Sequence, residues 1–95
     1  MSHPPLTEPE YALIALLGEE TMPLGAGALR LALETRGFHL SEATAGRILQ
    51  RLDRLGYTER CGFQGRRLSS EGRRLYEAHR ILQHRMQSAR GVMSA

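Results

Sequence analysis

The sequence predicts a small α+β domain that is mainly helical, with a three-helix core, a two-stranded hairpin and a C-terminal helix. Three observations support this fold class. The 95-residue chain is long enough for one modest core. Apolar residues recur at helical spacing in four segments. Two short segments flank a loop bounded by glycines just before the last of these segments, which is the pattern of a β-hairpin.

The N-terminal part predicts a flexible arm over residues 1–6 and a first helix over residues 8–18. The arm contains two prolines and shows no periodicity. Thr7 can cap the helix, and Glu10 stands three residues later, which is the spacing of a capping box. The apolar face of this helix ends at Gly18.

Two more helices are expected, over residues 25–36 and 42–55. Pro23 separates the first of them from the N-terminal helix, and the residues just before it, 21–22, could add one short strand. Gly37 ends that helix, and a link of about four residues leads to Ser41, which is a good N-cap for the next. The helix over residues 42–55 is the most periodic in the chain. Its buried stripe is Ala45, Ile48, Leu49, Leu52 and Leu55.

A hairpin and a last helix complete the predicted fold. Residues 57–61 and 66–68 flank the loop over residues 62–65, and the last helix covers residues 70–90. The domain proper then spans residues 7–69, and residues 70–95 form the C-terminal helix. Two helices joined by a short link and followed by a hairpin are a helix-turn-helix with a wing.

Charge is distributed unevenly along the chain. Residues 1–35 contain one Arg and five Glu, whereas residues 36–95 contain twelve Arg and only five acidic residues. A basic half on a small domain is the electrostatic footprint of a polyanionic partner. We therefore expect double-stranded DNA as the partner.

The third helix and the hairpin carry the candidate DNA-binding residues. Opposite the buried stripe, the third helix presents Arg and Gln, the residue types that read guanine and adenine in the major groove. The hairpin has Arg residues on both sides of a Gly-containing tip, which suits contact with a phosphate backbone. The candidates are Ser41, Ala43, Thr44, Arg47, Gln50, Arg51, Arg54, Arg60, Gln64, Arg66 and Arg67. The alternatives are a solvated helix face and a simple turn in which Phe63 folds back onto the domain.

The sequence also resembles a known family. It is similar to the winged-helix domain at the N-terminus of NrpR-type nitrogen regulators, within the winged helix-turn-helix superfamily, over residues 10–78. The resemblance rests on these stretches: residues 14–17, 23–26, 37–42, 52–60 and 65–72. The last two, Leu52-Asp53-Arg54-Leu55-Gly56-Tyr57-Thr58-Glu59-Arg60 and Gly65-Arg66-Arg67-Leu68-Ser69-Ser70-Glu71-Gly72, are the most specific. It implies a DNA-binding repressor that reads DNA with its third helix. The separate metabolite-sensing domains of NrpR-type regulators have no counterpart in these 95 residues.

The C-terminal helix is the expected dimerisation element. Apolar residues in it alternate in steps of three and four, as in a helix-pairing seam. The seam is Leu75, Ala78 or His79, Leu82, Met86, Ala89 and Met93. A homodimer would match an operator of two-fold symmetry. The alternative is that this helix packs across the first helix of its own chain.

Several classes of protein are not expected. The chain has no catalytic constellation and no Cys/His metal spacing, so we expect neither an enzyme nor a cofactor or metal. Its 5% aromatic content and lack of Trp argue against a base-stacking platform. A single Cys, no signal peptide and no apolar run near 20 residues favour a cytoplasmic location and no membrane. The alternatives to a DNA-binding regulator are a winged-helix module that binds protein and an accessory domain of an enzyme.

Overall fold

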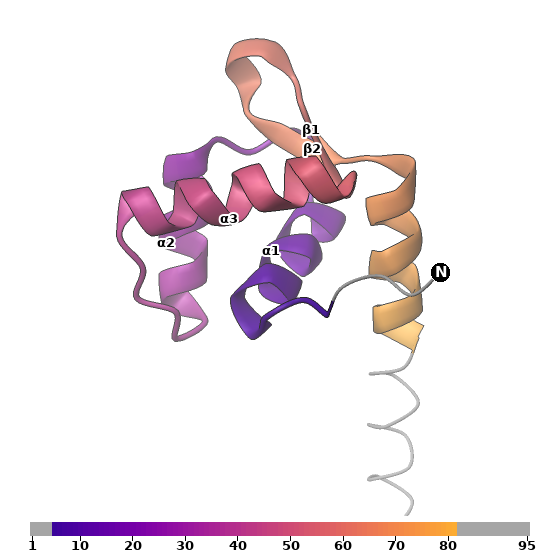
Figure 1. Ribbon diagram of the computed structural model, residues 1–95, viewed down its shortest axis with the longest axis horizontal. Helices are drawn as coiled ribbons and strands as arrows, with labels where there is room; N and C mark the ends of the chain where they lie inside the picture. The colour runs from indigo at the N-terminus through magenta and orange to yellow at the C-terminus, as the bar shows by residue number, and fades with distance from the viewer. Residues whose placement is uncertain (1–4, 82–95) are drawn as a thin grey trace, which may run out of the picture.

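The computed structural model describes residues 5–81 and confirms the predicted fold class. The helices are α1 (Glu8–Glu19), α2 (Ala26–Thr35) and α3 (Glu42–Leu55). The hairpin consists of β1 (Thr58–Arg60), one turn of 3-10 helix, η1 (Gly62–Gln64), and β2 (Arg66–Leu68). A C-terminal helix follows and is described over residues 70–81. In Figure 1, α3 crosses in front of α1 and α2, and the hairpin extends beyond it, away from the other helices.

The helix ends form as the sequence predicts. At the start of α1 the Thr7 amide donates to a Glu10 carboxylate oxygen at 2.7 Å, and the Glu10 amide donates to the Thr7 hydroxyl at 3.4 Å. At the start of α3 the Ser41 hydroxyl accepts from the Thr44 amide at 3.1 Å. Gly56 ends α3 with a φ of +84°, a conformation that glycine adopts without strain. The capping box, the Ser41 cap and the glycine end are therefore confirmed.

The link between α2 and α3 is longer than predicted, because α2 ends at Thr35. Gly37 has a φ of +91°, and the Phe38 amide reaches back to the Leu33 carbonyl at 3.0 Å. This is the hydrogen-bonding pattern of a Schellman motif, in which a residue with positive φ ends the helix. Residues 36–41 then carry the chain into α3, which is a six-residue link in place of the expected four.

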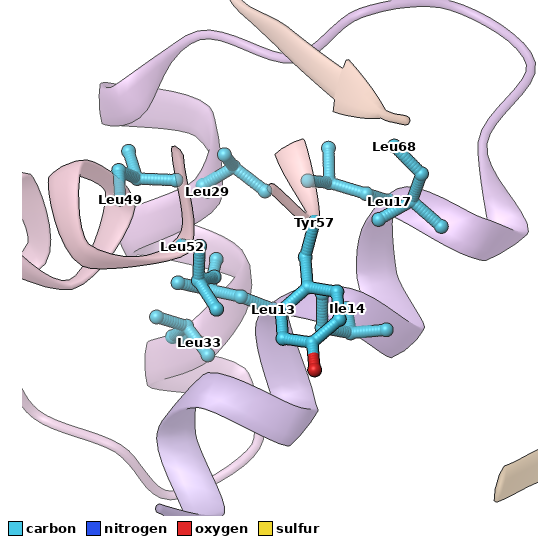
Figure 2. Packing of buried hydrophobic residues seen from close by; sticks show 9 residues of the cluster. All are labelled: Leu13, Ile14, Leu17, Leu29, Leu33, Leu49, Leu52, Tyr57 and Leu68. Atoms are coloured by element: carbon cyan, nitrogen blue, oxygen red, sulfur yellow. The ribbon is translucent and has the colours of Figure 1, made fainter. Parts of the chain in front are cut away.

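The core lies where the three helices meet the base of the hairpin (Figure 2). All three helices contribute leucines to it, and Tyr57 and Leu68 close it from the two flanks of the hairpin. Its buried members are Leu13, Ile14, Leu17, Leu29, Leu33, Leu49, Leu52, Tyr57 and Leu68. Because both hairpin flanks contribute a core side chain, the wing is fixed to the same core as α3.

A third segment pairs with the hairpin, but not where we expected it. Leu24 and Arg66 form a single antiparallel bridge, with N–H···O distances of 3.0 and 2.8 Å. Thr21 and Met22, the predicted strand, form a bend and are exposed. The strand prediction at residues 21–22 was therefore wrong, because the chain turns there and meets β2 only two residues later.

The C-terminal helix packs against α1 over its described length. The Tyr76 ring lies against Gly18, where an added Cβ would stand 2.3 Å from a ring carbon. The Arg73 guanidinium donates to the Gly18 carbonyl at 3.2 Å, and the Tyr11 and His79 rings stack with centroids 5.1 Å apart. This contact within the chain uses the side of the helix that carries Tyr76 and His79.

Some of the predicted features fall outside the described residues. The seam positions Leu82, Met86, Ala89 and Met93 and the first four residues of the arm belong to that part of the chain. Leu6, which was assigned to the arm, is half-buried and packs on the core. Among the described helices none is long and apolar enough to cross a membrane.

Candidate nucleic-acid interface

One face of α3 presents long polar side chains to solvent. Arg47, Gln50 and Arg54 are exposed, and within residues 5–81 none of them forms a hydrogen bond or an ion pair. Ala43 is exposed on the same face one turn earlier, and its small side chain leaves room for a close approach. The face that helical spacing predicted is therefore present, and no side chain among residues 5–81 pairs with its polar groups.

The N-terminal end of that face is occupied by the cap. The Ser41 hydroxyl accepts from the Thr44 amide and donates to the Thr44 hydroxyl at 3.0 Å. Ser41 is exposed and Thr44 is half-buried. These two candidate residues lie beside the face, and their first role is to begin the helix.

Asp53 of α3 holds the wing. The Arg66 guanidinium donates to its Oδ2 at 2.9 Å, and the Thr58 hydroxyl donates to its Oδ1 at 2.6 Å. Burial on its own would raise the pKa of Asp53. The hydrogen bonds from Arg66 and Thr58, with the nearby charge of Arg60, outweigh burial and lower the pKa. Asp53 is therefore an anion that ties α3 to both strands.

This carboxylate explains how Arg60 and Arg66 tolerate one another. They stand directly opposite across the two strands, where like charges repel. Asp53 supplies the compensating negative charge from within the domain. The Arg66 side chain is only 11% exposed, so little of its surface is accessible to a ligand.

A groove runs between α3 and the wing. It is lined by Gln50, Asp53, Arg54, Arg60 and Arg66. Three guanidinium groups face one carboxylate there, so the groove carries net positive charge. It joins two of the predicted elements, the reading face of α3 and the basic wing, into one continuous surface.

Arg67 and Gln64 belong to the wing but not to this groove. Successive side chains on a strand point to opposite faces, so Arg67 points away from Arg66. Its guanidinium lies 3.6 Å from Glu59 on the neighbouring strand, and both side chains are exposed. Gln64 is exposed at the tip, beside Phe63, which is fully exposed. The alternative in which Phe63 folds back onto the domain was therefore wrong.

Arg51 points toward α1 and not toward the exposed face of α3. Its Nη1 lies 2.6 Å from both carboxylate oxygens of Glu10 on α1. The Glu10 residue is only 2% exposed. Burial raises the pKa of this carboxyl, but hydrogen bonds from the Thr7 amide and from Arg51 outweigh that effect and lower it. Arg51 thus neutralises a buried acid, which is a structural role.

Sequence reasoning missed the two carboxylates that organise these arginines. Glu10 was identified as a capping residue, which it is, but its second partner lies 41 residues away. Asp53 was counted only as a charge. Neither partner leaves a local signal, because ion pairs between distant elements depend on the packing of the helices.

No group of three or more His, Cys, Asp or Glu side chains within the described residues is arranged to hold a metal ion. The chemistry that the surface offers is that of cations and hydrogen-bond donors.

Comparison with known proteins gives one family. A family model of the ribonuclease R winged-helix domain matches residues 11–75, from α1 into the C-terminal helix. No curated protein matches the chain. The family match supports the winged-helix part of the resemblance drawn from the sequence, but not its assignment to NrpR-type regulators.

Proposed function

This chain belongs to the ribonuclease R winged-helix domain family, and we propose that it binds duplex DNA with α3 in the major groove and the wing on the sugar–phosphate backbone. One observation carries the proposal. Arg47, Arg54 and Arg60 gather on α3 and the adjoining wing without an ion pair among the described residues. Guanidinium groups without an internal counter-ion are available to bind the phosphates of a nucleic acid.

The residues divide by the contact that each is placed to make. Arg47 and Gln50, at the centre of the exposed face, are the candidates for base edges, and Ala43 lets the helix approach. Arg54 and Arg60, at the groove, and Arg67, on the outer side of the wing, are the candidates for phosphates. Phosphate contacts fix the register of the protein, while base contacts carry the sequence information.

DNA is favoured over RNA by the shape of the surface. An α-helix fits the major groove of B-form DNA, whereas the major groove of A-form RNA is too narrow and deep for side chains to read. The second candidate is duplex RNA, and the observation that favours it is the family itself, since its description names a ribonuclease. An RNA ligand would fit the reading of the chain as an accessory domain of an enzyme.

Fluorescence anisotropy with matched DNA and RNA duplexes tests the proposal. We expect the DNA duplex to bind more tightly, and we expect Arg54→Ala to weaken its binding. Arg80→Ala is the matched control, because Arg80 is an exposed arginine on the C-terminal helix, paired with Glu77 and not part of the groove. Tighter binding of RNA would select the second candidate. Equal effects of the two variants would overturn the assignment of the surface.

The regulatory role is the finer form of this proposal. A repressor, as the NrpR-type resemblance implies, must bind one operator far more tightly than random DNA. Selection from a pool of random duplexes would then converge on one sequence, and on an inverted repeat if the protein is a dimer. If no sequence is enriched in the pool, the protein binds DNA without sequence specificity, and the repressor role is rejected.

Dimerisation through the C-terminal helix is a separate part of the proposal. Of the seam positions that the structure describes, Ala78 is exposed and open to a second copy. Leu75 instead packs on the core and the His79 ring stacks on Tyr11, so these two positions serve the chain's own domain. Sedimentation equilibrium should give twice the chain mass of 10.6 kDa at micromolar concentration. A single-chain mass would favour the alternative in which the helix serves only its own domain.

A further inference from the structure

The wing tip exposes an aromatic ring that the fold does not use. Phe63 is fully exposed, and the other large hydrophobic side chains exposed among the described residues, Met22, Leu31 and Ile81, are all aliphatic. Removing a phenyl ring from water is favourable, so a ring held in solvent is available to a ligand. Neither the core nor the groove accounts for it.

The turn holds this ring in a defined place. The Cys61 amide donates to the Gly65 carbonyl at 2.8 Å, and the Gln64 amide donates to the Cys61 carbonyl at 3.0 Å. Gly62 and Gly65 have φ values of +59° and +110°, which glycine adopts without strain. The first residue of β2, directly after the turn, is fixed by the bridge between Leu24 and Arg66. A ligand would meet a pre-formed tip, so little conformational entropy is lost on binding.

The surroundings of the ring indicate what that ligand is. Arg60 and Arg66 lie at the strand ends next to the turn, exposed Arg67 follows one residue further along β2, and Gln64 beside the ring is exposed and polar. The other residues of the tip are glycines and a half-buried Cys61, which offer no contiguous apolar patch for a protein or a lipid. A flat π-face within reach of cations matches a nucleobase attached to its phosphate.

We propose that Phe63 stacks on an unpaired nucleobase that adjoins the duplex held by α3 and the wing. The inference rests on the proposed function, because the arginines must first place the wing on nucleic acid. The base must be unpaired, since an intact duplex hides its base faces and opening it costs stacking energy. The low aromatic content that argues against a platform for several bases is compatible with one ring for one base.

Three matched DNA ligands test the inference. They share one duplex, which is blunt, or carries three unpaired thymidines, or carries three abasic residues that keep the phosphates without the bases. We expect the parent protein to prefer the thymidine overhang to the abasic one by about 5- to 150-fold, the range found for single aromatic–base stacks. Phe63→Ala should remove this preference and leave binding to the blunt duplex unchanged. Phe63→Tyr should keep it.

Two further variants secure the result. Leu31→Ala removes an exposed apolar side chain on α2, away from the wing, and should leave every affinity unchanged. Phe63→Trp places the only tryptophan of the chain at the tip, because the natural sequence has none. Stacking should quench its fluorescence on the thymidine overhang and not on the abasic one.

The outcomes separate this inference from the proposed function. If the parent protein binds none of the three ligands, both fail. If it binds all three and Phe63→Ala changes no preference, the stacking role is rejected while the DNA-binding surface stands. An unchanged fluorescence of Phe63→Trp on the thymidine overhang would reject stacking in the same way.

Discussion

At the scale of single residues, two arginines of one helix have opposite tasks. Arg47 points to solvent and forms no ion pair within the described residues, whereas Arg51, one turn later, neutralises the buried Glu10. The amino-acid composition does not distinguish the two arginines. From helical spacing we predicted that both side chains contact DNA. The packing of α3 on α1 gives them different tasks, because it brings Arg51 to Glu10 and leaves Arg47 in solvent.

This difference predicts opposite effects of the two alanine variants. Arg51→Ala leaves a buried carboxylate without its cation, so the free energy of unfolding should fall by about 3 kcal/mol, the lower end for a broken buried pair because Arg51 is partly exposed. The affinity of the folded protein for DNA should not change. Urea unfolding and anisotropy on the same samples measure the two quantities.

Arg47→Ala should do the reverse. Its unfolding free energy should stay within about 0.5 kcal/mol of the parent value, as for ordinary surface substitutions. The binding free energy should weaken by about 1–3 kcal/mol on an operator in which Arg47 reads a guanine, with relaxed specificity at that base. A variant that binds operator and random DNA as the parent does would show that Arg47 reads no base.

The pH dependence of stability is a further prediction at this scale. The pKa of Glu10 is lowered in the folded state from its ordinary value of 4.5, so its contribution is fully present above pH 4.5 and is lost as the pH falls through the folded pKa. Glu10→Gln should therefore be less stable than the parent at pH 7. The gap should narrow as the pH falls below 4.5, as followed by urea unfolding. A gap that is constant with pH would contradict the assignment.

At the scale of elements, the wing depends on one glycine in its turn, directly before β2. Gly65 has a φ of +110°, and a Cβ there would stand 2.2 Å from the Leu24 carbonyl oxygen. Gly65→Ala should detach β2 from Leu24 and lower the unfolding free energy by about 2 kcal/mol. Gly27→Ala is the control, because nothing lies within 4 Å of its added Cβ on α2. We expect that variant to be as stable as the parent or slightly more stable. Thermal unfolding of both variants is the measurement, and equal effects would contradict the strain at Gly65.

The elements were also the part of the fold that the sequence predicted best. Thr7, Ser41, Gly37 and Gly56 are local signals for helix ends, and the structure uses all four. The misplaced strand at residues 21–22 shows the limit. Whether Leu24 pairs with Arg66 depends on where the wing lies, and a sequence pattern does not contain that information.

At the scale of the whole molecule, the sequence predicted which elements carry the candidate site but not its internal organisation. The basic face of α3 and the basic wing follow from spacing and charge. The groove between them follows from Asp53, which joins Arg66 and Thr58 across two elements. The exposure of Phe63 depends on the conformation of the turn, and the spacing of the hairpin residues left both orientations open.

The salt dependence of binding to a random DNA duplex tests the central claim most directly. If Arg54, Arg60 and Arg67 each contact a phosphate, log Kobs should fall against log salt concentration with a slope of about −2.7. The Kd should lie near 10⁻⁴–10⁻⁶ M at physiological salt, roughly the range of non-specific DNA binding. Anisotropy of a labelled duplex measures both. Binding that is absent, or that does not change with salt, would contradict a phosphate-contacting surface on α3 and the wing.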